Sequence, residues 1–235
     1  MIINFNRGVN QLKKKVFVTI MASTIVASMA TGAYGATKLQ EIKAFLNPAI
    51  SIKVDGVPTQ LKDSNGLNIV PITYKNTTYL PVRAVSDALN IAVNYDSKSD
   101  TVQLGEKVDG TAISKGFNDM YHTKDPQFTN YKGKDYKEVF YDNASSNRSS
   151  SFMLYPKKQH QTLYLQIAAI DEPIEKLTIK DSNNNVILKT VDVINPEQEL
   201  ITVEVNVGGV DALYVHADAK SGGKVFIPLT TSYYK

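Results

Sequence analysis

The stretch IVPITYKNTTYLPVRAVSDALNIAVNYDSKSDTVQL, residues 69–104, decides the fold of the first half of the chain. Apolar and polar residues alternate on both sides of Lys75–Thr77, a pattern that predicts a β-hairpin. Alternation returns at 91–95 and at 101–104, with the turn-forming residues 96–100 between them. The stretch therefore predicts strand, hairpin, strand, helix, strand, turn and strand.

The helix is expected to begin near Pro81, which fits a first helical turn because its backbone angle is fixed and it lacks an N–H donor. Asn90 suits the left-handed position that ends a helix. Arg83 and Asp87 are spaced for an ion pair along the helix. The apolar stripe, which needs a sheet to cover it, consists of Val82, Val85 and Leu89.

The residues TTYLPVRAV at 77–85, followed by Ala88–Leu89 and Tyr95–Asp96, resemble the stalk domain of copper amine oxidases. This domain occurs as a separable module in many secreted bacterial proteins. The resemblance covers residues 38–105. It implies a small antiparallel sheet packed on one helix, and it implies no catalytic residue in this module.

The first residues have the pattern of an export signal. Arg7 and the lysines at 13–15 precede an apolar run at 16–30, and the small residues at 31–36 follow it. This order predicts a secretory signal peptide at 1–35, cleaved near Ala36, and a secreted or cell-surface protein. The alternative is an uncleaved membrane anchor.

Charge and cysteine content narrow the class of protein. The formal charge of +3 comes from the four basic residues of the signal segment, without which 22 basic residues face 23 acidic ones. A near-neutral chain of this kind is a poor partner for nucleic acid. The absence of cysteine excludes disulfides and thiol catalysis.

From Phe152 onward the chain alternates like a series of short antiparallel strands, which predicts a β-sandwich. The fold class expected is therefore α+β, with a small sheet on one helix followed by a β-sandwich. The domains expected are a signal peptide at 1–35, a stalk-like domain at 36–105, a linker at 106–118 and a sandwich at 119–235.

The second half also resembles NPCBM-type carbohydrate-binding modules, over about residues 111–235. This resemblance implies a sandwich fold and glycan binding. The residues that carry it are Gly133–Tyr136, Ser149–Phe152, Tyr155–Pro156, Gln161–Leu163, Leu177–Asp181 and Val205–Leu213.

Catalytic chemistry finds little support in the sequence. Asn94–Asp96 matches the tripeptide in which amine oxidases form their quinone, but it lies in an expected stalk strand and no His-x-His pair accompanies it. His122, His160 and His216 are ordinary surface or core histidines by default. No nucleophile elbow, phosphate-binding loop or zinc signature occurs, so we expect no enzyme and no cofactor or metal.

The Asx-rich run from Asp181 to Asp192 loosely resembles a calcium-binding loop. Because it lacks the glycine and the final glutamate of such a loop, we predict a hairpin turn there.

Sugar binding needs flat aromatic faces, and with no tryptophan this role falls to tyrosine. Tyr131, Tyr136 and Tyr141, in a polar region, are the candidates for exposed glycan contacts. Tyr155 and Tyr164 are expected to be structural.

The sequence thus favours a secreted, non-catalytic protein of the cell envelope. Its sandwich would bind cell-wall or extracellular polysaccharide, or another envelope protein, and its stalk would serve as a spacer. The alternative is a purely structural scaffold that binds a protein through an edge strand and has no glycan ligand.

Overall fold

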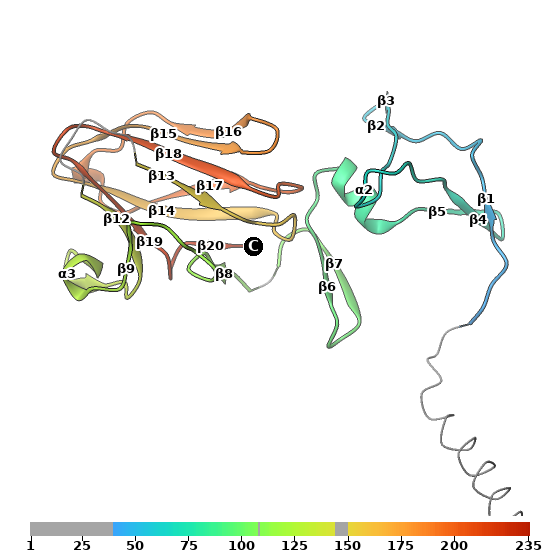
Figure 1. The fold of residues 1–235 in the computed structure, drawn as a ribbon, viewed down its shortest axis with the longest axis horizontal. Helices are drawn as coiled ribbons and strands as arrows, with labels where there is room; N and C mark the ends of the chain where they lie inside the picture. The colour runs from blue at the N-terminus through green and yellow to red at the C-terminus, as the bar shows by residue number, and fades with distance from the viewer. Residues whose placement is uncertain (1–39, 108, 144–149) are drawn as a thin grey trace, which may run out of the picture. The chain divides into compact units, whose positions relative to one another are not determined.

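The computed structural model describes residues 40–107, 109–143 and 150–235 (Figure 1). The expected signal peptide at 1–35 lies outside the described residues. The chain separates into two units at residues 44 and 45, and the elements below all belong to the unit Phe45–Lys235. Within the described ranges, no helix is long and apolar enough to cross a membrane.

The stalk segment, as we call residues 40–105, forms small antiparallel sheets and one helix. The sheets are β1–β4–β5, β2–β3 and β6–β7. The expectation of a single sheet packed on the helix was therefore wrong. The elements are β1 (Phe45–Leu46), β2 (Lys53–Val54), β3 (Val57–Pro58), β4 (Ile72–Tyr74), β5 (Thr77–Tyr79), α2 (Val82–Ala88), β6 (Val93–Asp96) and β7 (Thr101–Leu104).

Local sequence explains these elements well. Lys75 and Asn76 have φ angles of 47° and 61°, as a two-residue turn between twisted strands requires. Helix α2 begins directly after Pro81, and Asn90 takes the predicted left-handed angle, with φ 52°. The predicted ion pair along α2 is not formed, since Asp87 pairs with Lys158 at 3.4 Å instead.

The β-sheet segment, residues 111–235, consists of antiparallel strands and one short helix. It contains β8 (Thr111–Ala112), β9 (His122–Thr123), α3 (Pro126–Thr129), β10 (Asn130–Tyr131), β11 (Lys134–Asp135), β12 (Val139–Asp142), β13 (Ser150–Leu154), β14 (Thr162–Ile170), β15 (Ile174–Asp181), β16 (Val186–Val191), the 3₁₀ turn η2 (Pro196–Gln198), β17 (Ile201–Asn206), β18 (Leu213–Ala219), β19 (Lys224–Pro228) and β20 (Tyr233–Tyr234).

Two sheets form the layers of this segment (Figure 1). One has the order β13–β18–β15–β16. The other has the order β8–β20–β14–β19–β12–β9, and β17 pairs with β14 as well. Strand β14 pairs with β20 and β19 along one edge and with β17 along the other, so this sheet curls into a half-barrel. The described chain is mostly β with two short helices, which corrects the α+β expectation, whereas the expected antiparallel sheets are confirmed.

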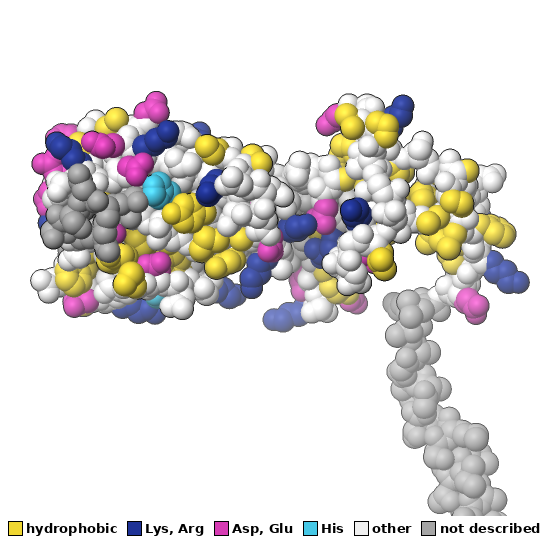
Figure 2. Space-filling model, turned by 45° about the horizontal axis from the view of Figure 1, so that its top comes forward, with side chains coloured by type: hydrophobic (Ala, Val, Ile, Leu, Met, Phe, Trp, Pro, Cys, Tyr) yellow, Lys and Arg dark blue, Asp and Glu magenta, His cyan; other side chains and the backbone are white. Residues whose placement is uncertain are grey.

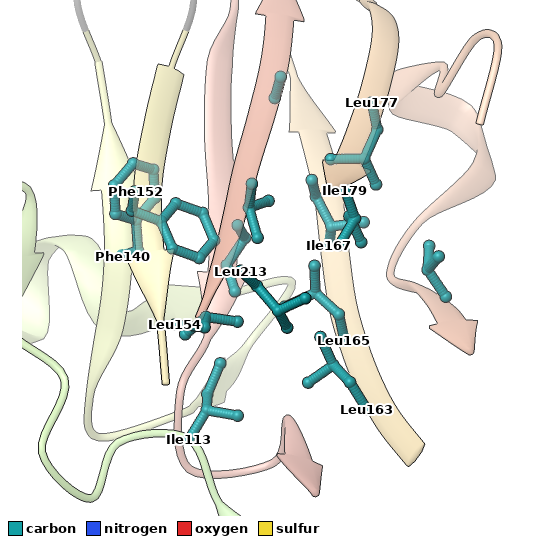
Figure 3. Close-up of a cluster of buried hydrophobic side chains, with 14 of the residues drawn as sticks. Ile113, Phe140, Phe152, Leu154, Leu163, Leu165, Ile167, Leu177, Ile179 and Leu213 are labelled. Atoms are coloured by element: carbon teal, nitrogen blue, oxygen red, sulfur yellow. The ribbon is translucent and has the colours of Figure 1, made fainter. Parts of the chain in front are cut away.

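The main core lies between the two sheets (Figure 3). Alternate residues of each strand point inward, as the sequence pattern predicts. Leu163, Leu165 and Ile167 of β14 face Ile179 and Leu213 of the smaller sheet, and all five side chains are fully buried.

The end of the stalk segment is bonded to loops of the β-sheet segment. Ala92 N donates to Oε1 of Gln161 at 2.9 Å, and Val93 N donates to the carbonyl of Lys158 at 3.2 Å. A Cβ added to Gly208 would lie 2.1 Å from the carbonyl oxygen of Asn90, so this contact requires glycine. Thr111–Ala112, placed in the expected linker, pairs with β20 as strand β8.

Candidate functional site

Two of the tyrosines predicted to bind glycan are buried. Tyr131 and Tyr136 are only 9% and 8% exposed. Both pack on Phe226 on the outer face of the curled sheet, with ring centroids 5.0 Å and 5.5 Å away. They belong to a second small core, and burial raises the pKa of Tyr131. The predicted exposure of these two rings was wrong, because α3 and the β10–β11 hairpin fold over this face of the sheet.

Tyr141, the third candidate, lies on β12 and is half-buried. Its ring packs against Phe128 with centroids 5.1 Å apart, and burial raises the pKa of its hydroxyl. A role in binding for Tyr131, Tyr136 and Tyr141 stays a prediction.

The three histidines lie in different surroundings. His122 Nε2 lies 2.8 Å from Oε1 of Glu138, and His160 is buried with its ring stacked on Tyr234 at 4.8 Å. Burial lowers the pKa of His160 to about 4. Across residues 40–107, 109–143 and 150–235, no group of three His, Cys, Asp or Glu side chains could hold a metal ion. The described residues therefore do not fit a copper centre.

The other motifs have structural roles in the part of the chain that the structure describes. The hydroxyl of Tyr95, in the amine-oxidase-like tripeptide, donates to Oδ1 of Asp100 at 2.7 Å across the β6–β7 turn. The carboxylate of Asp181 accepts bonds from the backbone N–H groups of Asn183 and Asn184. This confirms the predicted hairpin turn between β15 and β16.

A different set of side chains forms a polar and aromatic surface on the outer face of the smaller sheet. Along β18, Leu213, Val215 and Ala217 point into the core, so Tyr214, His216 and Asp218 stand on the outer face. We call the surface of Met153, Tyr155, Tyr214, His216 and Asp218 the β13–β18 face. In the sequence, this face could be recognised from the alternation along β18, in which polar and aromatic residues occupy every second position.

Two rings of this face, those of Tyr214 and His216, contact each other. Tyr214 and His216 are parallel to within 21°, with centroids 5.8 Å apart. The Tyr214 hydroxyl lies 3.3 Å from Nδ1 of His216, and Nε2 of His216 lies 3.1 Å from Oδ1 of Asp218. With Nε2 protonated, the imidazole donates to Asp218 and accepts from Tyr214. Lys180 Nζ, from the neighbouring strand β15, lies 5.0 Å from the Tyr214 ring centroid.

The face continues toward β13. Met153 pairs with Tyr214 across the strands, and Tyr155, just past the end of β13, is 55% exposed. Both line a hollow of about 110 Å³ together with Lys115 and Lys157. The structural role expected of Tyr155 stays a prediction. The arrangement offers flat ring surfaces beside donors and acceptors, which suits noncovalent binding of a polar ligand with apolar faces.

A second stacked ring pair lies on the curled sheet. Tyr164 and Tyr233 stack with centroids 4.9 Å apart on the outer face of the curled sheet. Gly110 lies so close that an added Cβ would be 2.7 Å from the Tyr233 ring. The Tyr164 hydroxyl lies 3.5 Å from Oε1 of Glu106. Glu106 and Gly110 therefore lie against this ring pair.

Comparison with known families supports the stalk assignment. The family model described as copper amine oxidase N-terminal domain matches residues 60–125. The match begins later than the resemblance seen in the sequence and ends just before α3. No curated protein matches the chain.

Among solved structures, the chain is similar to one described as the M60 catalytic domain with the CBM51-1 and CBM51-2 domains of Clostridium perfringens ZmpB. The identity is 8%, the TM-score is 0.33, and the alignment covers 80% of this chain and 19% of that one. A likeness at this level says nothing about what this chain binds. The resemblance of the second half to NPCBM-type modules stays a prediction.

Proposed function

We propose that this protein is a secreted, non-catalytic component of the cell envelope that binds glycan through its β-sheet segment. The observation that carries the proposal is the Tyr214–His216 ring pair on the β13–β18 face, held in place by Asp218. Pyranose rings stack on flat aromatic faces, and their hydroxyls bond to polar groups at the rim. The stalk segment would act as a spacer.

The rigidity of this ring pair favours binding. Both side chains stand on a central strand, since β18 pairs with β13 on one side and β15 on the other. Their hydrogen bonds to each other and to Asp218 fix the ring orientation before a ligand arrives. A site that is already ordered loses less conformational entropy on binding.

The test is a binding screen of the exported chain against purified cell wall and a panel of soluble polysaccharides. Tyr214→Ala is expected to weaken binding about 2- to 12-fold, since an aromatic stacking contact contributes about 0.5–1.5 kcal/mol. Tyr214→Phe keeps the ring and should bind nearly as well. Tyr95→Ala, which removes an exposed ring from the stalk segment, is the control.

Two results would count against the proposal. One is failure of the wild-type chain to bind any glycan, and the other is binding that Tyr214→Ala and His216→Ala leave unchanged. A screen in which Tyr131→Ala alone abolished binding without loss of fold would instead return the site to the tyrosines predicted from sequence.

One feature favours the scaffold alternative. Strand β16 is an edge of its sheet, paired only with β15 among the described strands, and it exposes Val186 and Ile187 by 53% and 62%. Such an edge can accept a strand of another protein. Lys189 in the same strand weakens this reading, because lysine on an edge discourages strand addition.

A further inference from the structure

The hollow at the end of the β13–β18 face combines aromatic and basic residues. Met153 and Tyr155 of that face line it, and Tyr234, Lys115 and Lys157 line it as well. Its volume of about 110 Å³ leaves room for one small charged group of a ligand, because a water molecule takes about 30 Å³ of liquid volume. The aromatic face therefore ends in a recess that positive charges can reach.

The two lysines of the hollow stand on ordered turns. The backbone N–H of Lys157 donates to the carbonyl of Asp211 at 3.1 Å, and the backbone N–H of Lys115 donates to the carbonyl of Ala112 at 3.3 Å. Both residues are exposed. The backbone of each lysine is therefore fixed, while its long side chain can turn toward a ligand.

No acidic side chain neutralises the lysines around the hollow. In the part of the chain that the structure describes, Lys107, Lys115 and Lys157 form no ion pair and no side-chain hydrogen bond. By contrast, Lys132 and Lys224 of the same segment pair with a glutamate and an aspartate. The three charges are therefore available to an anion of a ligand.

The unpaired lysines also lie close enough to act on one another. Burial, and then the charge of Lys115, lower the pKa of Lys107. Burial, and then the charge of Lys107, lower the pKa of His160, whose ring stacks on Tyr234 at the hollow. Like charges that are brought together repel each other, and an anion placed between them relieves the repulsion.

The ring pair has a positive neighbour on its other side. Nζ of Lys180, which lies near the Tyr214 ring, donates to the neutral amide oxygen of Asn185 at 3.1 Å. The acidic member of the face, Asp218, is bonded to His216. Figure 2 shows lysine or arginine side chains beside hydrophobic side chains and a histidine on the β-sheet segment. The aromatic surface is therefore flanked by positive charge.

We propose that the β13–β18 face binds a polysaccharide that carries anionic groups, with a sugar ring stacked on Tyr155 and with carboxylate or phosphate groups paired with Lys115 and Lys157. This inference rests on the glycan binding proposed above and adds the charge of the ligand. Net charge does not supply the attraction, because 22 basic residues face 23 acidic ones once the signal segment is set aside. Any preference for an anion must come from where these lysines lie.

The experiment is isothermal titration calorimetry of the exported full chain at low salt with two pairs of probes. Polygalacturonate carries carboxylates, and its fully methyl-esterified form is the neutral counterpart. Phosphomannan carries phosphates, and mannan is its neutral counterpart. At least one anionic polymer should bind about 2- to 30-fold more tightly than its counterpart, because two exposed ion pairs contribute about 0.2–1 kcal/mol each. The pair of probes that shows the preference identifies the anionic group.

Variants assign the preference to the lysines. The double variant Lys115→Gln/Lys157→Gln should bind the anionic and neutral polymers with nearly equal affinity, and circular dichroism checks that it is folded. Lys189→Gln is the matched control, because it removes another exposed lysine at the opposite edge of the smaller sheet from β13. This control should keep the preference. Added salt should reduce the preference in the wild-type chain, since it screens surface charges.

Four outcomes separate this inference from the proposed function. Equal affinity of the wild-type chain for charged and neutral polymers would overturn the inference and leave glycan binding intact. A preference that the double variant retains would overturn the assignment to Lys115 and Lys157. Equally tight binding of polyglutamate, a polyanion without sugar, would show charge attraction alone and would also overturn the inference. If no polymer of either kind binds, the proposed glycan binding is itself wrong.

Discussion

Replacing Tyr131 separates the burial seen in the structure from the exposed binding role predicted by the sequence. The ring is 91% covered and stacks on Phe226, with planes 22° apart. An aromatic side chain buries about 150–250 Å², and at about 25 cal/mol per Å² this amounts to roughly 4–6 kcal/mol as an upper estimate. Because alanine keeps part of that contact, Tyr131→Ala should destabilise the fold by about 3–4 kcal/mol.

The assay is urea unfolding of the exported chain, followed by circular dichroism. Tyr131→Phe preserves the stack on Phe226 and should cost less than about 1 kcal/mol. Tyr155→Ala removes a ring that is 55% exposed and should also cost less than about 1 kcal/mol. A Tyr131→Ala chain that unfolds at the wild-type urea concentration and yet fails to bind polysaccharide would refute the burial argument.

Two further predictions concern single positions. Gly208→Ala should break the contact between Asn90 and the Gln161 loop, because the new Cβ would lie 2.1 Å from a backbone oxygen, and hydrogen exchange at the Ala92 amide should become faster. Unchanged protection of that amide would contradict this. The pKa of His160 is lowered to about 4 from an ordinary 6.5, so the native state stays neutral while the unfolded chain takes up a proton. The free energy of unfolding should not depend on this proton above pH 6.5 and should fall by up to about 3 kcal/mol as the pH drops toward 4. In the His160→Phe chain, it should fall less over the same range. Identical pH dependence of the two chains would argue against this role for His160.

The candidate site shows where sequence reasoning reached its limit. Alternation along β18 predicts that Tyr214 and His216 share one face of a sheet, but it does not say whether another element covers that face. The same alternation places Tyr141 on β12, where α3 packs and covers part of its ring. The exposure of a side chain on a strand depends on which distant segments pack over that strand. The local sequence pattern does not show which segments these are.

The sequence by itself determined the local elements. Backbone preferences of single residues explain three of them: the turn at Lys75–Asn76, the start of α2 after Pro81 and the left-handed conformation of Asn90. The alternating strands and their inward-facing residues follow from the period of two. Such features depend on neighbours in the chain, so they can be read without the fold.

Only the tertiary structure decided which faces are covered. It placed Tyr131 and Tyr136 in a second core and paired Asp87 with Lys158. It also left the side chains of Ile72 and Leu89 exposed to solvent. These outcomes rest on contacts between residues far apart in the sequence. Their energies come from packing and desolvation, which arise only when the distant surfaces meet.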